Sequence, residues 1–264
     1  MTSKSKKNMH ILSIFLFAIT IILNYMSASG ILFPYTQREI SDMYSNLLAP
    51  TSLTFSIWGV IYMGSILTFI YPWRKKISDE FKDFYYDKIV ILNITWSIFN
   101  IIWTITWNTD RILISLIAII LYSLTLIYLA KTLSSYPNFA KQNKLFITYP
   151  IGLHAGWLIF ASFTNIMVLM VKNGFDAFSS IGVLLTILLM ITACITVLYI
   201  LSTTNNSSIT LPALWALIGI VIKQRPQSDF LNSNKTVMIT AIILFILSLI
   251  SHFLILKKNK TLLQ

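Results

Sequence analysis

Residues 93–108 read NITWSIFNIIWTITWN and combine an apolar run with a repeating pattern of asparagine and tryptophan. On a helix that turns about 100° per residue, five of these side chains fall within an arc of about 80°. They are Asn93, Trp96, Asn100, Trp103 and Trp107. An asparagine amide is costly to place against lipid, so we expect this stripe to face the protein interior.

The composition around this stretch indicates a membrane protein. The mean hydropathy is +0.75 and 11% of the residues are charged, whereas a soluble domain has about 25%. Charged residues fall at the ends of the apolar segments or between them, which argues against an ion pathway built from buried acids. The fold class is therefore an all-α polytopic membrane protein. Eight segments are expected to cross the bilayer: residues 9–31, 52–72, 88–108, 111–132, 145–171, 178–201, 209–222 and 237–256.

The basic residues indicate an orientation. The net charge is +11, but the basic clusters flank apolar segments, so we expect the partner to be the lipid bilayer and not a nucleic acid. The loops after segments one, three and five hold one basic residue each, Arg38, Arg111 and Lys172. The positive-inside rule then places the N-terminus in the cytoplasm of what we expect to be a bacterial cytoplasmic membrane. The clusters are Lys4, Lys6 and Lys7, then Arg74, Lys75, Lys76, Lys82 and Lys88, then Lys131, Lys141 and Lys144, and finally Lys257, Lys258 and Lys260.

Two segments admit alternatives. Segment 209–222 is short, and basic residues follow it, so a re-entrant segment would place the C-terminus on the outside. The first segment has a basic start, and Ser27 and Ser29 resemble a cleavage site for a signal peptide. Its apolar stretch is longer than that of a usual signal peptide, so we expect a retained helix.

Two further helices carry stripes like that of residues 93–108. In residues 55–69 the stripe is Phe55, Trp58, Tyr62, Ser65 and Phe69, and in residues 149–165 it is His154, Trp157, Ala161 and Asn165. Gly152 and Gly156 lie on the opposite face of the second of these helices and form a GxxxG pattern. This pattern predicts close packing against a neighbouring helix.

The stripes permit two interpretations. In the first, Asn100 makes a hydrogen bond to another helix, and the tryptophans pack around that bond. In the second, the face that contains Asn100 lines a cavity for a flat aromatic or polycyclic ligand. Trp107 lies nearer the membrane surface, where an aromatic belt is expected.

His154 and Cys194 bear on metal binding. A lone histidine can be an axial haem ligand, but no second histidine or cysteine is placed to complete a site. We therefore expect a structural His154 with Tyr62 or Asn100 as its partner. The single cysteine, Cys194, excludes a disulfide framework and a cysteine-based metal site, and is expected to be a packing residue.

Four motifs resemble the tryptophan-rich sensory protein and mitochondrial translocator protein family (TspO/MBR). MYSNLLAP (43–50) is similar to the family's Y-x-N-L-x-x-P, and Trp58 with Tyr62 to its W-x-x-x-Y. NIIW (100–103) is similar to N-x-x-W, and Trp157, Ala161 and Asn165 keep the W-x3-A-x3-N spacing. The resemblance covers about residues 9–171, and longer bacterial members look like the whole chain.

The resemblance implies a five-helix TspO-like bundle over residues 1–172, with a C-terminal extension of two to three transmembrane helices over residues 173–264. It implies a pocket for a porphyrin or a similar planar hydrophobic ligand, no required cofactor, and dimerisation as an option. The function expected is binding or sensing, and the alternative is transport of small amphipathic molecules. Enzyme activity rests only on the porphyrin breakdown that the resemblance permits, since no catalytic constellation is found. The ligand-binding residues expected are Trp58, Tyr62, Asn100, Trp103, Trp157 and Asn165, to which the stripes add Trp107 and His154.

Overall fold

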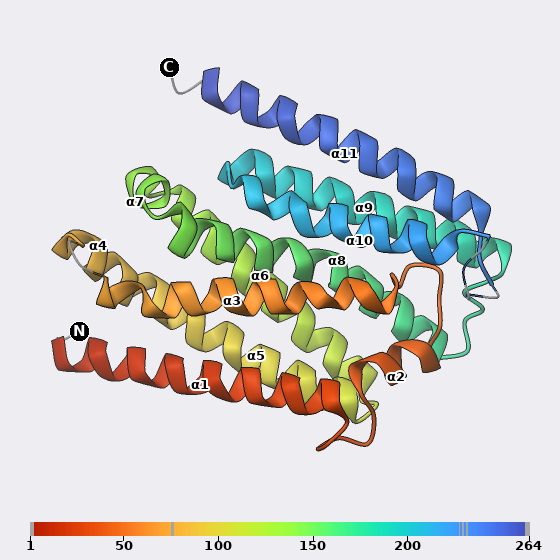
Figure 1. Cartoon of the computed structure of the whole chain (residues 1–264), viewed down its shortest axis with the longest axis horizontal. Coiled ribbons are helices and arrows are strands. Elements are labelled where there is room, and N and C mark those ends of the chain that lie inside the picture. Colours follow the sequence, from red (N-terminus) through yellow and green to blue (C-terminus); the bar gives the residue numbers. More distant parts are fainter. Residues whose placement is uncertain (1–2, 75–76, 227, 229, 231, 262–264) are drawn as a thin grey trace.

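The computed structural model describes residues 3–74, 77–226, 228, 230 and 232–261, and its regular structure there is helical throughout (Figure 1). The elements are α1 Ser3–Ser29, α2 Gln37–Met43, η1 Ser52–Ser56, α3 Ile57–Ile70, η2 Tyr71–Trp73, α4 Asp79–Phe84, η3 Tyr85–Ile89, α5 Val90–Asn108, α6 Ile112–Ser134, α7 Pro137–Gln142, η4 Lys144–Thr148, α8 Tyr149–Lys172, α9 Ser180–Thr204, η5 Ser207–Thr210, α10 Leu211–Gln224 and α11 Lys235–Thr261.

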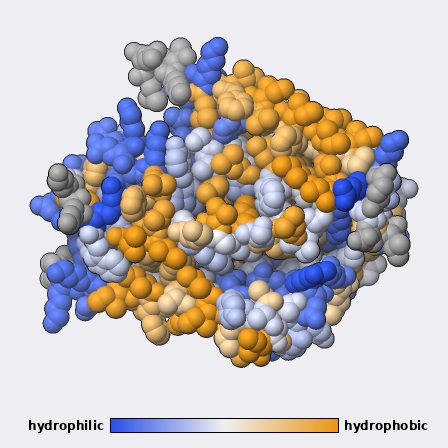
Figure 2. Space-filling model, in the orientation of Figure 1, coloured by the Kyte–Doolittle hydropathy of each residue, from blue (hydrophilic) through white to orange (hydrophobic). Residues whose placement is uncertain are grey.

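Eight helical stretches of the described residues are long and apolar enough to cross a membrane, as the sequence predicts. They lie side by side, with both termini at the same end of the bundle (Figure 1). Hydrophilic side chains gather towards the two ends, and much of the surface between them is apolar (Figure 2). The protein is therefore an integral membrane protein. The stretches are Lys4–Ser29, Ser52–Trp73, Asp79–Asn108, Ile112–Ser134, Lys144–Lys172, Ser180–Thr204, Ser207–Gln224 and Lys235–Asn259.

The third stretch begins nine residues before the predicted position 88, at Asp79. Ser78 caps this helix by accepting a hydrogen bond from the Phe81 amide at 3.2 Å, and acidic residues in the first turn favour the positive end of the helix dipole. Lys6 on α1 forms ion pairs with Asp83 at 2.8 Å and with Asp87 at 2.9 Å. The charged start of this helix therefore also anchors α1.

The seventh stretch, Ser207–Gln224, has 18 residues and a rise of about 27 Å. Pro212 lies in the first turn of α10, where a helix tolerates proline. The chain runs antiparallel through α9, α10 and α11 and returns to the end that holds the N-terminus (Figure 1). The re-entrant alternative, which would place the C-terminus at the other end, is wrong for this structure.

The predicted GxxxG contact is confirmed, although its partner is a turn and not a long helix. A Cβ on Gly156 would lie 2.0 Å from the carbonyl oxygen of Ile209, and one on Gly152 would lie 2.1 Å from Ser208 Oγ. The Asn206 amide also donates to the Thr148 carbonyl at 2.6 Å. η5 is therefore pressed against the first half of α8.

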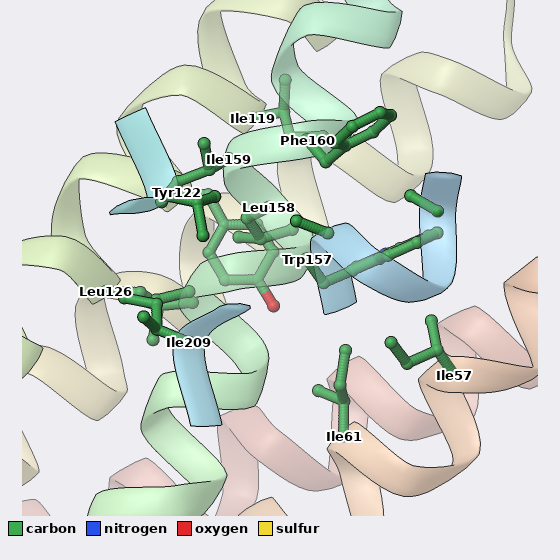
Figure 3. Packing of buried hydrophobic residues seen from close by; sticks show 14 of the residues in the cluster. Ile57, Ile61, Ile119, Tyr122, Leu126, Trp157, Leu158, Ile159, Phe160 and Ile209 are labelled. Atoms are coloured by element: carbon green, nitrogen blue, oxygen red, sulfur yellow. The ribbon is translucent and has the colours of Figure 1, made fainter. Parts of the chain in front are cut away.

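Side chains from α3, α6 and η5 pack around α8 (Figure 3). The spans differ in how much of their most apolar part is buried inside the protein. The buried share is 56% of the residues in the fifth stretch and 61% in the seventh, but only 17% in the last. α8 and α10 thus form the interior, and α11 lies at the periphery. The basic clusters expected to face the cytoplasm lie at the end that holds the termini, except Lys75 and Lys76, which lie outside the described residues.

Candidate ligand pocket

A cavity of about 40 Å³ lies between α2, α3, α5 and α8, at the end of the bundle away from the termini. Its walls are mainly aromatic, with a few amide and hydroxyl groups among them. The lining residues are Gln37, Ser41, Pro50, Phe55, Trp58, Trp103, Trp107, Trp157, Phe160, Ala161, Thr164 and Asn165.

Four tryptophans from three helices meet at this cavity. The ring of Trp58 on α3 lies 6.0 Å from that of Trp103 on α5 and 6.2 Å from that of Trp157 on α8. Trp103 and Trp107 stack at 5.9 Å with an angle of 30° between their planes. The stripes seen in the sequence thus converge on a single aromatic wall.

Two polar groups in the aromatic wall can make directed hydrogen bonds. Asn165 accepts a hydrogen bond from Trp103 Nε1 at 3.4 Å, and its own amide donates to the Ala161 carbonyl at 2.9 Å, which fixes its orientation. Trp157 is 3% exposed, and its Nε1 makes no hydrogen bond within the described part of the chain. A buried indole N–H normally has a partner, so this donor is available to a bound molecule.

The short helix α2 covers the cavity. It begins with a capping box, in which Thr36 Oγ1 accepts from the Glu39 amide at 3.1 Å and Glu39 Oε2 accepts from the Thr36 amide at 2.7 Å. The Thr36 hydrogen bonds hold the pKa of Glu39 below its ordinary value. Trp107 Nε1 donates to the backbone carbonyl of Gln37 at 3.2 Å. The side-chain amide of Gln37 donates to Asn24 Oδ1 at 3.1 Å. α2 is therefore fastened to both α5 and α1.

The loop after α2 carries the Y-x-N-L-x-x-P motif. Asn46 Oδ1 accepts from the amides of Leu48 at 3.0 Å and Ala49 at 2.9 Å, which folds the loop so that Pro50 reaches the cavity. Gln224 at the end of α10 donates to the Leu47 carbonyl at 3.0 Å. The seventh span thus supports the loop that closes the pocket.

Tyr44, Asp110 and Lys172 form a latch beside α2. The Tyr44 hydroxyl donates to Asp110 Oδ1 at 2.8 Å, and Lys172 Nζ lies 2.8 Å from the same carboxylate. Asp110 has φ 58°, a left-handed backbone conformation that non-glycine residues rarely adopt. Burial, followed by the Asp110 carboxylate, raises the pKa of Tyr44, so its hydroxyl stays a donor at neutral pH. The latch joins the α2 loop to the α5–α6 turn and to the end of α8.

Removing the Tyr44 hydroxyl should loosen α2. A hydrogen bond to a charged group contributes about 1.5 kcal/mol or more, so Tyr44→Phe should raise the open population about tenfold. The measurement is the rate of tryptic cleavage after Arg38, which lies in α2. Tyr35→Phe, at an exposed position in the loop before α2, is the matched control. Equal cleavage rates in the two variants would show that Tyr44 does not hold α2 in place.

The chain matches the family model described as TSPO-like protein over residues 10–254. It belongs to the TSPO-like family. No curated protein and no solved structure matches the chain. The family match continues past residue 172 and through most of α11, while the division of the chain at that residue stays a prediction.

Five of the eight residues predicted as a site line the cavity of this TSPO-like protein: Trp58, Trp103, Trp107, Trp157 and Asn165. Tyr62 does not line the cavity, but its ring stacks on that of Trp58 at a centroid distance of 5.3 Å. Trp107 is 5% exposed beneath α2, so its ring faces the protein interior and not the lipid, while its depth in the membrane stays a prediction. The cause is α2, which covers this end of α5.

Asn100 and His154 belong to a hydrogen-bonded network outside the cavity. Asn100 accepts from the Asn24 amide at 2.8 Å and donates to the Tyr122 hydroxyl at 3.0 Å, which joins α5 to α1 and α6. The partner of His154 is Tyr122, and the expectation of Tyr62 or Asn100 was wrong. For Asn100 the interhelical interpretation is therefore the correct one.

The stripes did not point to five residues of the lining, namely Gln37, Ser41, Pro50, Phe160 and Thr164. Gln37 and Ser41 lie on α2, which is too short to show a clear apolar period. The signal that could have found it is TQRE (36–39), the capping-box pattern that marks the start of a helix.

Proposed function

We propose that this TSPO-like protein binds a planar hydrophobic ligand, such as a porphyrin, between the four tryptophans and α2. The observation that carries the proposal is the convergence of Trp58, Trp103, Trp107 and Trp157 on one cavity. Indole faces stack on flat rings, while the free N–H of Trp157 supplies one directed hydrogen bond. Family membership supports a role in membrane binding or transport in general.

The cavity must enlarge when such a ligand binds. Its volume is about 40 Å³, whereas pockets for ligands of this class measure about 300–1,000 Å³. α2 is the element best placed to move, because it is short and is held by a few hydrogen bonds to Asn24, Trp107 and Asp110. Binding is therefore expected to compete with the contacts that close α2.

A titration with protoporphyrin IX tests the site. The absorbance band of the porphyrin is the signal, because it does not depend on the number of tryptophans left in a variant. Trp157→Phe keeps an aromatic ring but removes the free donor, and should weaken binding by about 3- to 10-fold. Trp103→Phe, which also loses its contact with Asn165, should have an effect of similar size.

Trp215→Phe is the matched control. Trp215 lies on α10, and its Nε1 donates to the Thr54 carbonyl at 2.9 Å, outside the cavity. Thermal unfolding of each variant establishes that it is folded. Equal porphyrin affinity in folded Trp157→Phe, Trp103→Phe and Trp215→Phe would exclude this cavity as the site.

An open groove of about 850 Å³ at the opposite end of the bundle favours a second candidate, transport of small amphipathic molecules. His10, Trp73 and Tyr86 line it together with lysines and aspartates. Gradient-driven uptake of a labelled amphiphile into proteoliposomes would support transport, and saturable binding without uptake would support binding alone.

A further inference from the structure

Three cavities follow one another along α3 and its neighbours. The first contains Trp58, the second contains Ser65 and Phe69, and the third, the open groove, contains Trp73. The 15 positions from Trp58 to Trp73 rise about 22 Å, which is most of a hydrocarbon core of about 30 Å. The cavities therefore mark a line through the bundle from one end towards the other.

Buried polar atoms without partners lie along the same line. Six such atoms lack a hydrogen bond of good geometry among the described residues, and three of them line the cavities: Trp157 Nε1 the first, Asn93 Nδ2 the second and His10 Nε2 the third. Tyr62 Oη is a fourth and lies on α3 between the first two cavities. The Tyr62 hydroxyl also interacts with the side chain of Asn100, and the His10 ring with the Phe69 carbonyl.

The second cavity has the size and the chemistry of a water site. Its volume is about 10 Å³, close to the smallest space that holds one water molecule, which needs two to four polar partners. Asn93 Nδ2 is a free donor there. Ser65 Oγ and Thr68 Oγ1 donate to the carbonyls of Ile61 and Phe146, and their lone pairs remain available as acceptors.

We propose that these cavities form a transmembrane water path, a row of water molecules that runs between α3, α5 and α8 from the tryptophan pocket to the open groove. The free polar atoms of Trp157, Asn93 and His10 gain partners from such a row, and a buried polar group without a partner is costly. The path takes water and ions of similar size. It begins in the tryptophan pocket but does not depend on ligand binding there.

Two aromatic pairs narrow the path. Trp58 and Tyr62 stack at 5.3 Å between the first and second cavities. Phe69, which lines the second cavity, stacks on Phe17 of α1 at 4.3 Å with nearly parallel planes. Passage through either point requires the rings to part, so the path is closed to larger solutes.

Silver ions test the path, because Ag⁺ is small enough to follow water and reacts with thiols. The thiol loses its proton to water as the S–Ag bond forms. Ser65→Cys, which changes a single atom, and Thr68→Cys each place a thiol in the second cavity, in a Cys194→Ala background. In proteoliposomes treated with Ag⁺ from outside, both should lose their reactivity towards maleimide, measured after denaturation in SDS.

Two thiols outside the path are the controls. Cys194 in the unaltered protein is 4% exposed on α9, and Ser123→Cys places a thiol at a position on α6 that is 6% exposed. We expect the path thiols to react at least tenfold faster than both controls, and Phe69→Leu to accelerate Ser65→Cys further. Reaction of the path thiols at the rate of the controls would overturn the proposal, whatever the porphyrin titration shows.

Discussion

Gly156→Ala should lower the stability of the protein more than any other single methyl addition to a glycine on α8. The new Cβ would lie 2.0 Å from the carbonyl oxygen of Ile209 and 3.0 Å from its carbonyl carbon, so backbone must shift on one side or the other. Overpacking of this kind costs about 1–3 kcal/mol, and a clash with backbone belongs at the upper end. The apparent unfolding midpoint in mild detergent should fall by about 2–4 °C per kcal/mol.

Gly59→Ala is the matched control for that change. Gly59 lies in the first turn of α3, and a Cβ there would have no atom within 4 Å. Alanine is favoured over glycine in a helix by about 1 kcal/mol, so this variant should be neutral or slightly stabilised. If the two variants unfolded at the same temperature, the close contact between α8 and η5 would not exist in the membrane protein as described.

The helices and their buried faces could be predicted from the sequence because both depend on local patterns. A run of about 20 apolar residues is sufficient to identify a span, and a polar stripe at helical spacing is sufficient to identify its inner face. Asn93, Trp96, Asn100, Trp103 and Trp107 are indeed all buried, at 5% exposure or less. The family motifs then assigned all three stripes to one site.

What could not be predicted depends on contacts between distant segments. The burial of Trp107 is caused by α2, and nothing near residue 107 in the sequence indicates that cover. The partner of His154 is Tyr122, which belongs to a helix whose apolar residues show no clear stripe. No pattern in the sequence indicated that α10 would hold the loop that contains Pro50, through Gln224 and Lys223.

Asn100→Leu should be the most destabilising change among the polar residues of α5. One interhelical hydrogen bond in a membrane protein contributes about 0.6 kcal/mol on average. Asn100 does more, because it accepts from Asn24 and Thr104 and donates to Tyr122. Leucine would leave the buried Asn24 amide without that acceptor and Tyr122 without that donor, and each such group costs about 1–3 kcal/mol. The unfolding midpoint in detergent should therefore fall further than for any single hydrogen bond.

Asn93→Leu is the control. It shows how much stability depends on the hydrogen-bonded network of Asn100 and how much on any buried amide in α5. Asn93 lies on the same face of α5 and is equally buried, at 1% exposure, but it accepts only from Trp96 Nε1 at 3.0 Å, and its own amide has no partner. Its loss leaves the Trp96 indole N–H unpaired and breaks no hydrogen bond to another helix, so the midpoint should fall much less than for Asn100→Leu. A fall as large as that of Asn100→Leu would mean that the amides act through packing alone, and that the bonds joining α1, α5 and α6 do not set the stability of the bundle.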